Sequence, residues 1–246
     1  DITYEEGTLS IFAGNYLIEV VEADLNKVYN KANQMFVAKL TENGNEITGI
    51  SFTYVLKSTG EAFDGATNAG DYVVVVSYND PTYGSGSQEF TLHIEQATID
   101  MSGISFTDKE FTYDGLVHSL KIEGKLPEEI TKENYTGNDQ INKGTYSVNV
   151  SFEYDTANYK VVKDLTANLT INEKELEESM FESLPSVSYT GNKHEPEIKG
   201  TYSKMTLIKG TDFTVTYQNN IEKGTAKVIV SGINNYTGTV TLEFEI

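Results

Sequence analysis

The sequence predicts an all-β protein made of tandem β-sandwich modules. One observation is the composition, which includes 16 Tyr and 11 Phe in 246 residues, because aromatic and β-branched side chains favour pleated strands. The other is an internal repeat, in which the same turn and strand recur three times along the chain. Five to seven short strands fit in each repeat, and this density of strands is typical of a sandwich.

Each repeat opens with an aromatic strand and a tight turn. These segments are Val28-Tyr29-Asn30-Lys31, Phe111-Thr112-Tyr113-Asp114-Gly115 and Val187-Ser188-Tyr189-Thr190-Gly191. Asp-Gly is a strong turn signal, and the first repeat departs from it with Asn30-Lys31. Five residues after each Tyr stand Gln34, His118 and His194.

A glycine and then a strand mark the middle of each repeat. Residues 72–78, 146–152 and 226–232 align without gaps, and each run follows Gly70, Gly144 or Gly224, where a turn with positive φ would lead into the strand. In the second run apolar and polar residues alternate from Tyr146 to Phe152. This period of two predicts an antiparallel sheet with one buried face. The third run departs with Ala226 in place of the Tyr.

A closing strand ends each repeat, after a short polar loop that ends in Tyr83, Tyr159 or Tyr236. We expect its alternate residues to face inward. They are Phe90, Leu92 and Ile94, then Ala167, Leu169 and Ile171, then Leu242, Phe244 and Ile246.

The repeats predict four segments. Residues 1–22 are the tail of an upstream repeat or N-terminal strands, because both Gly7-Thr8-Leu9-Ser10-Ile11 and residues 13–20 resemble repeat strands. The others are repeat 1 (23–97), repeat 2 (98–173) and repeat 3 (174–246). Between Asn172 and Leu184 the spacing of Leu176, Met180 and Leu184 also fits a helix, but the register of the repeat favours an acidic linker that runs into a strand.

Charge and composition exclude several classes of function. The formal net charge is -19, and all 18 basic residues are Lys. An acidic chain without Arg repels phosphate backbones and anionic lipid, so we expect no nucleic-acid partner. The absence of Cys excludes disulfides and thiolate ligands. No leader-like or bilayer-length apolar stretch occurs, so we expect no membrane insertion, and the segment is intracellular or an internal piece of an exported chain.

No residue pattern in the chain indicates a catalytic or metal site. His93 falls on the outward face of a closing strand, and His118 and His194 occupy one equivalent position in different repeats. The Gly-rich run Tyr83-Gly84-Ser85-Gly86-Ser87 lacks the Gly-x-Ser-x-Gly spacing and is interpreted as a loop. The pairs Glu5-Glu6, Glu128-Glu129 and Glu177-Glu178 are interpreted as solvated charge. We expect no catalytic residue, no metal and no cofactor.

Two interpretations stay open, one of a binding role and one of a covalent modification. Exposed Tyr on one module could stack on sugars, although most Tyr recur at in-register positions that suit core packing. Lys is plentiful enough for Lys–Asn cross-links, which sequence spacing alone does not reveal. The ligand-binding residues are unknown.

The repeats resemble the MBG-type and YDG-type bacterial surface repeats. The resemblance rests on the Tyr113-Asp114-Gly115 and Tyr189-Thr190-Gly191 turns, on His118 and His194, and on the Lys143-Gly144-Thr145-Tyr146 and Asn235-Tyr236-Thr237-Gly238 segments. Residues 23–246 are covered almost completely. The resemblance implies immunoglobulin-like modules in an elongated array, with β-grasp-like modules as the alternative, and export to a bacterial surface.

The sequence thus predicts a non-catalytic tandem-repeat segment of a bacterial cell-surface or secreted protein. Its role would be that of a spacer, stalk or adhesin module. The alternative is a module that binds a glycan or a host extracellular protein. We expect a monomeric fragment of a larger chain, located outside the cell or on its surface.

Overall fold

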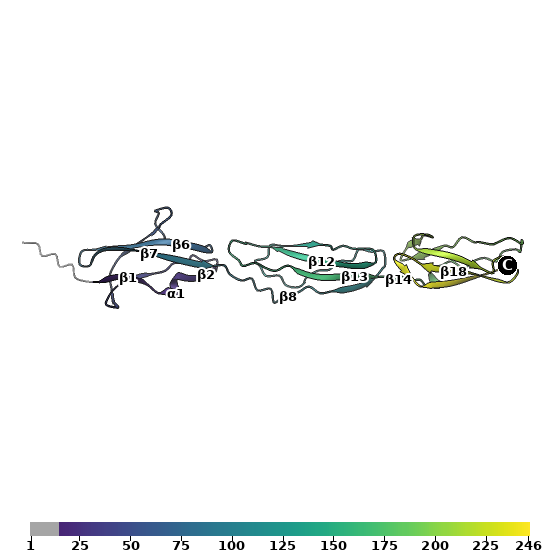
Figure 1. Cartoon of the computed structure of the whole chain (residues 1–246), viewed down its shortest axis with the longest axis horizontal. Coiled ribbons are helices and arrows are strands. Elements are labelled where there is room, and N and C mark those ends of the chain that lie inside the picture. The colour runs from purple at the N-terminus through teal and green to yellow at the C-terminus, as the bar shows by residue number, and fades with distance from the viewer. Residues whose placement is uncertain (1–14) are drawn as a thin grey trace, which may run out of the picture. The chain divides into compact units, whose positions relative to one another are not determined.

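Almost all regular structure in this protein is β-strand (Figure 1). The computed structural model describes residues 15–246. Its helices are α1 (Glu22–Leu25) and the 3-10 turn η1 (Glu178–Met180). The all-β class is therefore confirmed. Within residues 15–246 neither helix is long enough to cover a sheet, as the helix of a β-grasp module does. No helix in this part of the chain has the length and apolar character needed to span a bilayer.

The first repeat has two sheets around one core. Its strands are β1 (Tyr16–Val20), β2 (Asn26–Val28), β3 (Ala38–Glu42), β4 (Asn45–Ile47), β5 (Phe52–Leu56), β6 (Gly70–Asp80) and β7 (Gly84–Glu95). One sheet has the order β1-β3-β4 and the other β2-β7-β6-β5. Ile18 and Leu40 of the first sheet share a buried cluster with Val74 and Leu92 of the second, so the two sheets form a sandwich.

The other two repeats have a similar arrangement with shorter central and closing strands. Repeat 2 contains β8 (Ile104–Ser105), β9 (Lys109–Thr112), β10 (Glu123–Gly124), β11 (Lys132–Thr136), β12 (Gly144–Glu153) and β13 (Leu165–Asn172). Repeat 3 contains β14 (Lys174–Glu175), β15 (Gly200–Tyr202), β16 (Met205–Leu207), β17 (Phe213–Gln218), β18 (Thr225–Gly232), β19 (Tyr236–Thr237) and β20 (Thr239–Glu245). The main sheets are β11-β12-β13-β9 and β17-β18-β20.

The predicted alternation of buried and exposed residues is confirmed in the central strands. The inward valines are fully buried: Val74, Val76, Val148, Val150, Val228 and Val230. Each central strand pairs antiparallel with its closing strand, in β6·β7, β12·β13 and β18·β20 (Figure 1). The sequence did not reveal that the opening strand runs parallel to the closing strand, as β2 does to β7 and β9 to β13.

The predicted boundary near Glu22-Ala23 does not separate two modules. β1 pairs with β3 across it, in a register that sets Ile18 opposite Leu40, so residues 16–20 are N-terminal strand of the first sandwich and not the tail of an upstream repeat. The run Gly7-Thr8-Leu9-Ser10-Ile11 lies outside the described residues. The burial of Ile18 decides the assignment of residues 16–20, because Ile18 completes the core of the first sandwich.

The chain divides into two compact units. Unit 1 consists of the residues up to Ile99 together with Tyr154–Val162, and unit 2 consists of Asp100–Glu153 and Lys163–Ile246. The segment Tyr154–Val162, which the sequence assigns to repeat 2, therefore packs within unit 1. From Asp100 on, the rest of repeat 2 shares unit 2 with repeat 3. The division into three repeats remains a prediction from the sequence pattern.

The structure tests two local predictions, one for residues 83–87 and one for the segment after Asn172. The Gly-rich run at residues 83–87 is not simply a loop: Gly84 takes φ +75 and closes a hairpin, after which Ser85 and Ser87 pair with Asn79 and Ser77 in β7 and β6. The segment after Asn172 is not an α-helix. It holds the two-residue strand β14 and the turn η1, and Phe181 bridges to Gly200.

The opening turns of the three repeats have a common backbone form. Lys31, Gly115 and Gly191 all take positive φ, at +67, +80 and +73. In each turn the preceding polar side chain accepts a hydrogen bond from the backbone N–H two residues on, as the Asp114 Oδ1 does from Leu116 at 2.8 Å. Lys31 thus adopts the turn despite its side chain.

Candidate functional site

The three histidines lie in separate local settings. His93 is exposed on β7, with its Nδ1 2.5 Å from Asp71 Oδ1. His118 stacks on Phe111, and its Nε2 is 3.0 Å from the turn residue Asp114. Residues 15–246 contain no group of three His, Cys, Asp or Glu side chains placed to hold a metal ion.

His118 and His194 serve the backbone of their own repeat. The N–H of His118 donates to the Gln140 carbonyl, and the N–H of His194 donates to the Asn220 carbonyl, both at 2.8 Å. Gln34 makes the same bridge to Ala66 in repeat 1. Because a glutamine fills this position as well as a histidine, the position needs no imidazole chemistry.

The carboxylate pairs do not converge on a common point either. Glu177 is exposed and pairs with Lys174 at 2.5 Å, and this contact lowers the pKa of Glu177 and raises that of Lys174. Glu128 is exposed in a different repeat, and Glu5-Glu6 lies outside the described residues. That the chain has no catalytic residue stays a prediction.

Hydroxyls of strand tyrosines bond to the backbone inside the sandwiches. Tyr54 Oη accepts the N–H of Ala38 at 2.8 Å, and Tyr135 Oη accepts that of Ile122 at 3.1 Å. Tyr72 Oη donates to the Asn68 carbonyl at 3.0 Å. These three rings are partly buried against the cores of their sandwiches, and their hydroxyls have backbone partners, as phenols in such places usually do.

The polar site that does recur is a joint between an Asn-Tyr loop and the glycine turn of the preceding repeat. In unit 1 the loop residue is Asn158, which is 5% exposed. Its Oδ1 accepts the Ala69 N–H at 2.7 Å, and its Nδ2 donates to Asn68 Oδ1 at 3.2 Å. The same Nδ2 donates to Asp155 Oδ2 at 2.7 Å. The Asn158 amide is thus fully paired, as a buried amide must be.

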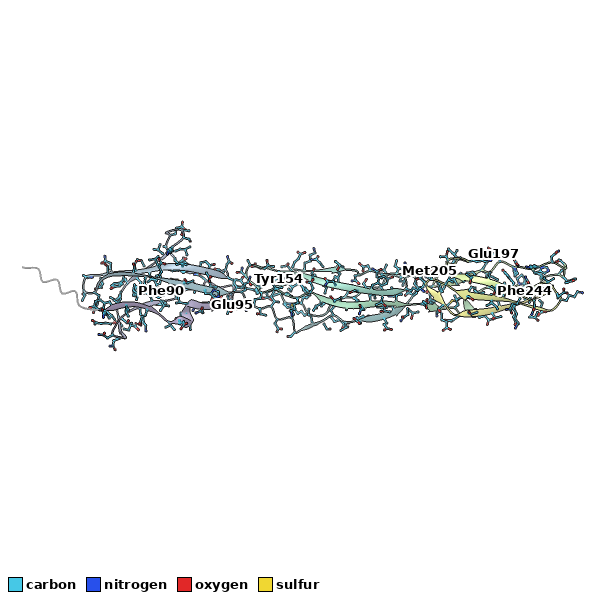
Figure 2. The ribbon with its side chains drawn as sticks, in the orientation of Figure 1. Phe90, Glu95, Tyr154, Glu197, Met205 and Phe244 are labelled. Carbon is cyan, nitrogen blue, oxygen red and sulfur yellow. The ribbon has the colours of Figure 1, made fainter. Side chains whose placement is uncertain are left out.

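The next residue of this loop supplies the apolar half of the joint. Tyr159 is buried and meets the Tyr29 ring edge-on, with centroids 5.2 Å apart. Its neighbour Lys160 pairs with Glu95 at 2.6 Å, which lowers the pKa of Glu95. Figure 2 labels Glu95, at the end of β7, and Tyr154, at the start of the segment that carries the loop.

Unit 2 contains a second joint with the same polar atoms. Asn235 Oδ1 accepts the Lys143 N–H at 2.8 Å, and Asn235 Nδ2 donates to Asn142 Oδ1 at 3.0 Å. The Asn235 carbonyl accepts the N–H of Lys174 at 2.9 Å. The Asn158 carbonyl accepts the N–H of Ala97 in the same way, at 3.0 Å.

The rings of this second joint are more deeply buried. Tyr236 is 2% exposed and meets both Tyr113 and Tyr202 edge-on, at 5.4 and 6.2 Å. Burial, with the neighbouring phenol of Tyr113, raises the pKa of Tyr236 far above the ordinary value of 10.0. Met205, labelled in Figure 2, lies against Gly115 of the opening turn. A Cβ on that glycine would come within 2.2 Å of the Met205 sulfur.

The two joints therefore have in common two amide hydrogen bonds and one edge-on tyrosine pair. Amides and protonated phenols bind and orient, but they supply no acid, base or nucleophile at neutral pH. The sequence pattern had shown Tyr159 and Tyr236 but not the role of the Asn before each. The signal was present in the shared Asn-Tyr dipeptides and in Asn68 and Asn142, each two residues before a repeat glycine.

The sequence matches no protein-family model. No curated protein matches it either.

Several solved multidomain structures are similar over most of the chain. The first three domains of the outer capsid protein Hoc of bacteriophage RB49 have a TM-score of 0.28 and 11% identity, covering 94% of this chain and 99% of that one. Drosophila N-cadherin EC1-4 has 0.24 and 11%, covering 89% and 72%. Domains 4–9 of the surface layer protein SbsC have 0.26 and 13%, covering 95% of this chain and 48% of that one. TM-scores this far below 0.5 do not establish a common fold.

Proposed function

We propose that this chain is a non-catalytic tandem-repeat segment of a bacterial cell-surface or secreted protein, and that it acts as a spacer. The observation that supports this most is the repeated joint. In both joints the Asn-Tyr loop contacts the preceding glycine turn through the same atoms. Such a contact joins one repeat to the next, as in other repeat proteins whose units contact their neighbours.

The charge of the chain supports an outward-facing role. A net charge of -19 keeps the chain soluble and repels anionic lipid. The ion pairs near the joints, Lys160–Glu95 and Lys143–Glu173, lie at the surface, where such pairs contribute little to stability. Export to a bacterial surface rests on the resemblance of the repeats to bacterial surface modules.

One observation favours the alternative, a binding module. An open pocket on repeat 3 is lined by Glu182, Glu195, Glu197, Lys199 and Tyr217, among others, and Figure 2 labels Glu197. Tyr217 Oη donates to the Pro196 carbonyl at 2.7 Å. Carboxylates around a partly apolar floor could accept hydrogen bonds from the hydroxyls of a glycan.

A binding screen separates the two roles. The full chain is applied to a glycan array and to a panel of extracellular matrix proteins, with the Glu195→Ala, Glu197→Ala double variant as a matched control. If the chain is a spacer, neither the natural chain nor the double variant gives a signal above background. Saturable binding by the natural chain that the double variant loses would replace the spacer role with the binding role at the repeat 3 pocket.

A further inference from the structure

The end of repeat 3 that carries the Thr190-Gly191 turn has the same register as the two joints. Gly224 and Ile246 exchange backbone hydrogen bonds of 3.1 and 3.0 Å, as the pairs Gly70↔Ile94 and Gly144↔Ile171 face each other in the other repeats. Val187 donates to the Glu245 carbonyl at 2.8 Å, which holds the opening segment of repeat 3 beside the closing strand, although this segment forms no regular strand. Tyr189 therefore occupies the place of Tyr29 and Tyr113.

In repeat 3, within the described residues, no aromatic ring packs on this tyrosine, and the Lys223 ammonium lies 5.5 Å from the centroid of its ring. Tyr189 is 46% exposed, whereas Tyr113, which Tyr236 covers, is 9% exposed. Tyr29, which Tyr159 covers, is half-buried. A large exposed ring whose two counterparts lie under a tyrosine edge indicates a contact surface.

The polar half of the joint is also present at this end. Lys223 has the place of Ala69 and Lys143, and within residues 15–246 its backbone N–H has no hydrogen-bond acceptor. Glu222 has the place of Asn68 and Asn142, and its carboxylate can accept an amide N–H as their Oδ1 atoms do. These residues line an open pocket with Asn219, Asn220, Ile221, Gly224 and Thr225.

We propose that the surface formed by Tyr189, Glu222 and Lys223 binds the Asn-Tyr loop of a further repeat of the same kind. This inference rests on the proposed spacer function and names the partner of its open end. In both joints the occupant is an Asn-Tyr loop, and it uses the same atoms each time.

The chemistry of this surface selects its occupant. The Glu222 carboxylate accepts hydrogen bonds but repels a second carboxylate, so it favours Asn over Asp in the loop. The corresponding loop of repeat 1 carries Thr82-Tyr83 and has no such amide. The surface therefore does not fit the repeat 1 loop of a second copy of this chain, which excludes a head-to-tail contact through that loop.

The first test places the repeat 3 residues in a joint that is already occupied. Asn142→Glu in the full chain converts the unit 2 surface to the Glu-Lys-Gly of repeat 3, and amide hydrogen exchange of Lys143 is followed by NMR. Asn235→Ala is the control, and it should speed exchange at Lys143 by about tenfold through loss of its acceptor.

If the proposal holds, the Lys143 amide of Asn142→Glu exchanges within about threefold of its rate in the natural chain. Exchange as fast as in Asn235→Ala would mean that the repeat 3 residues cannot hold the loop, and it would overturn the proposal. Folding of the variant is checked in the same spectra from the protection of the Val148 and Val150 amides, which lie in the fully buried part of β12.

The second test supplies the missing loop. Because Ile246 matches Ile171 in register, a copy of residues 172–246 appended directly after Ile246 sets its Asn-Tyr loop at the Tyr189 end. The Lys223 amide should then exchange about tenfold more slowly than in the natural chain. The same extended chain with Ala in place of the copied Asn235 should lose this protection.

An unchanged Lys223 rate in an extended chain whose appended core amides are protected would overturn the proposal. If those core amides are unprotected, the Asn142→Glu result decides alone. Binding of a glycan or matrix protein in the screen above would refute the spacer function without altering either exchange result, so the two failures can be told apart.

Discussion

The joints of unit 1 and unit 2 share the loop Asn and Tyr, the Asn of the glycine turn and the Tyr of the opening turn, but the residues around them differ. In unit 1 the surroundings are polar: Asp155 fixes the Asn158 amide, and Gln96 donates to the carbonyls of Thr156 and Ala157. In unit 2 they are largely apolar, since the Tyr202 ring packs on Tyr236 and the Met205 side chain covers Gly115.

This difference shows which parts of the joint are necessary. The Asn amide and the Tyr edge occur in both settings with nearly the same distances, whereas the flanking contacts are replaceable.

Removal of the loop tyrosine should cost more in unit 2 than in unit 1. Tyr236→Ala should lower the free energy of unfolding of unit 2 by about 4 kcal/mol, as truncation of a buried aromatic does. Tyr159→Ala should cost unit 1 about 1 kcal/mol less, because Tyr159 has one ring partner in place of two. Urea denaturation measures both, with Tyr236→Phe as the control that keeps the ring. Equal losses of unfolding free energy in the two units would mean that the apolar surroundings of Tyr236 add nothing to its contribution to stability.

Substitution of the turn glycines tests the Met205 contact. Gly115→Ala and Gly191→Ala both place a Cβ at positive φ, which costs about 1 to 2 kcal/mol. Only the Cβ at residue 115 also meets Met205, and because the atoms it meets are the flexible end of that side chain, this variant should lose only about 1 kcal/mol more. The additional Met205→Ala substitution should recover part of that excess. Thermal denaturation that gives the same stability for both glycine variants would contradict the prediction.

A carboxylate in place of the loop asparagine should be tolerated better in unit 2. At neutral pH Asn158→Asp should cost about 2 kcal/mol, because the new carboxylate faces Asp155, and Asn235→Asp about 1 kcal/mol. Asn158 lowers the pKa of Asp155 in the natural chain, and this support is lost in the variant. As the pH falls and the carboxyls become protonated, the deficit of Asn158→Asp should narrow. Unfolding curves at neutral and acidic pH check this, and a deficit independent of pH would count against it.

The buried phenol of Tyr236 should make unit 2 sensitive to alkali. Its pKa is raised by burial in the folded state, so at pH values above the ordinary 10.0 the hydroxyl ionises first in the unfolded chain. This contribution to stability is complete below pH 10.0 and is lost as the pH rises toward the folded-state pKa, at up to about 1.4 kcal/mol per pH unit. Tyr236→Phe should show a shallower alkaline decline in stability. Identical slopes of stability against pH for the variant and the natural chain would mean that another group causes the alkaline sensitivity.

The smallest effect is expected for the surface ion pair beside the unit 1 joint. Lys160→Ala removes the partner of Glu95, but both side chains are about half exposed. The change in melting temperature should be small and should vanish at high salt, because exposed pairs are screened. A loss that persists at high salt would instead assign Lys160 a packing role.

Local patterns made the interiors of the repeats predictable. Side chains of a strand alternate between its two faces, so the burial of Val148 and Val150 could be inferred from residues 146–152 alone. The turn at Asn30-Lys31 was harder to infer, because a lysine at positive φ breaks the local rule. It keeps the turn form through the hydrogen bond from the Ala32 N–H to Asn30 Oδ1.

Contacts between distant residues were not predictable in this way. The Ala69–Asn158 bond joins residues 89 apart, and the Lys143–Asn235 bond joins residues 92 apart. The Asn-Tyr dipeptides mark both asparagines, but the local sequence does not show which turn each of them contacts. The place of residues 16–20 was left open between an upstream tail and N-terminal strands for the same reason, since only the pairing of β1 with β3 places Ile18 in the core.

The sequence by itself determined the all-β class, the repeat and its register, because the period of two and the turn glycines are properties of neighbouring residues. The tertiary structure alone decided the parallel opening strands, the place of β1 and the pairing of each Asn-Tyr loop with a preceding turn. These depend on which backbone amides and rings remain without partners once the sheets have formed, and that can be known only when the whole fold is in place.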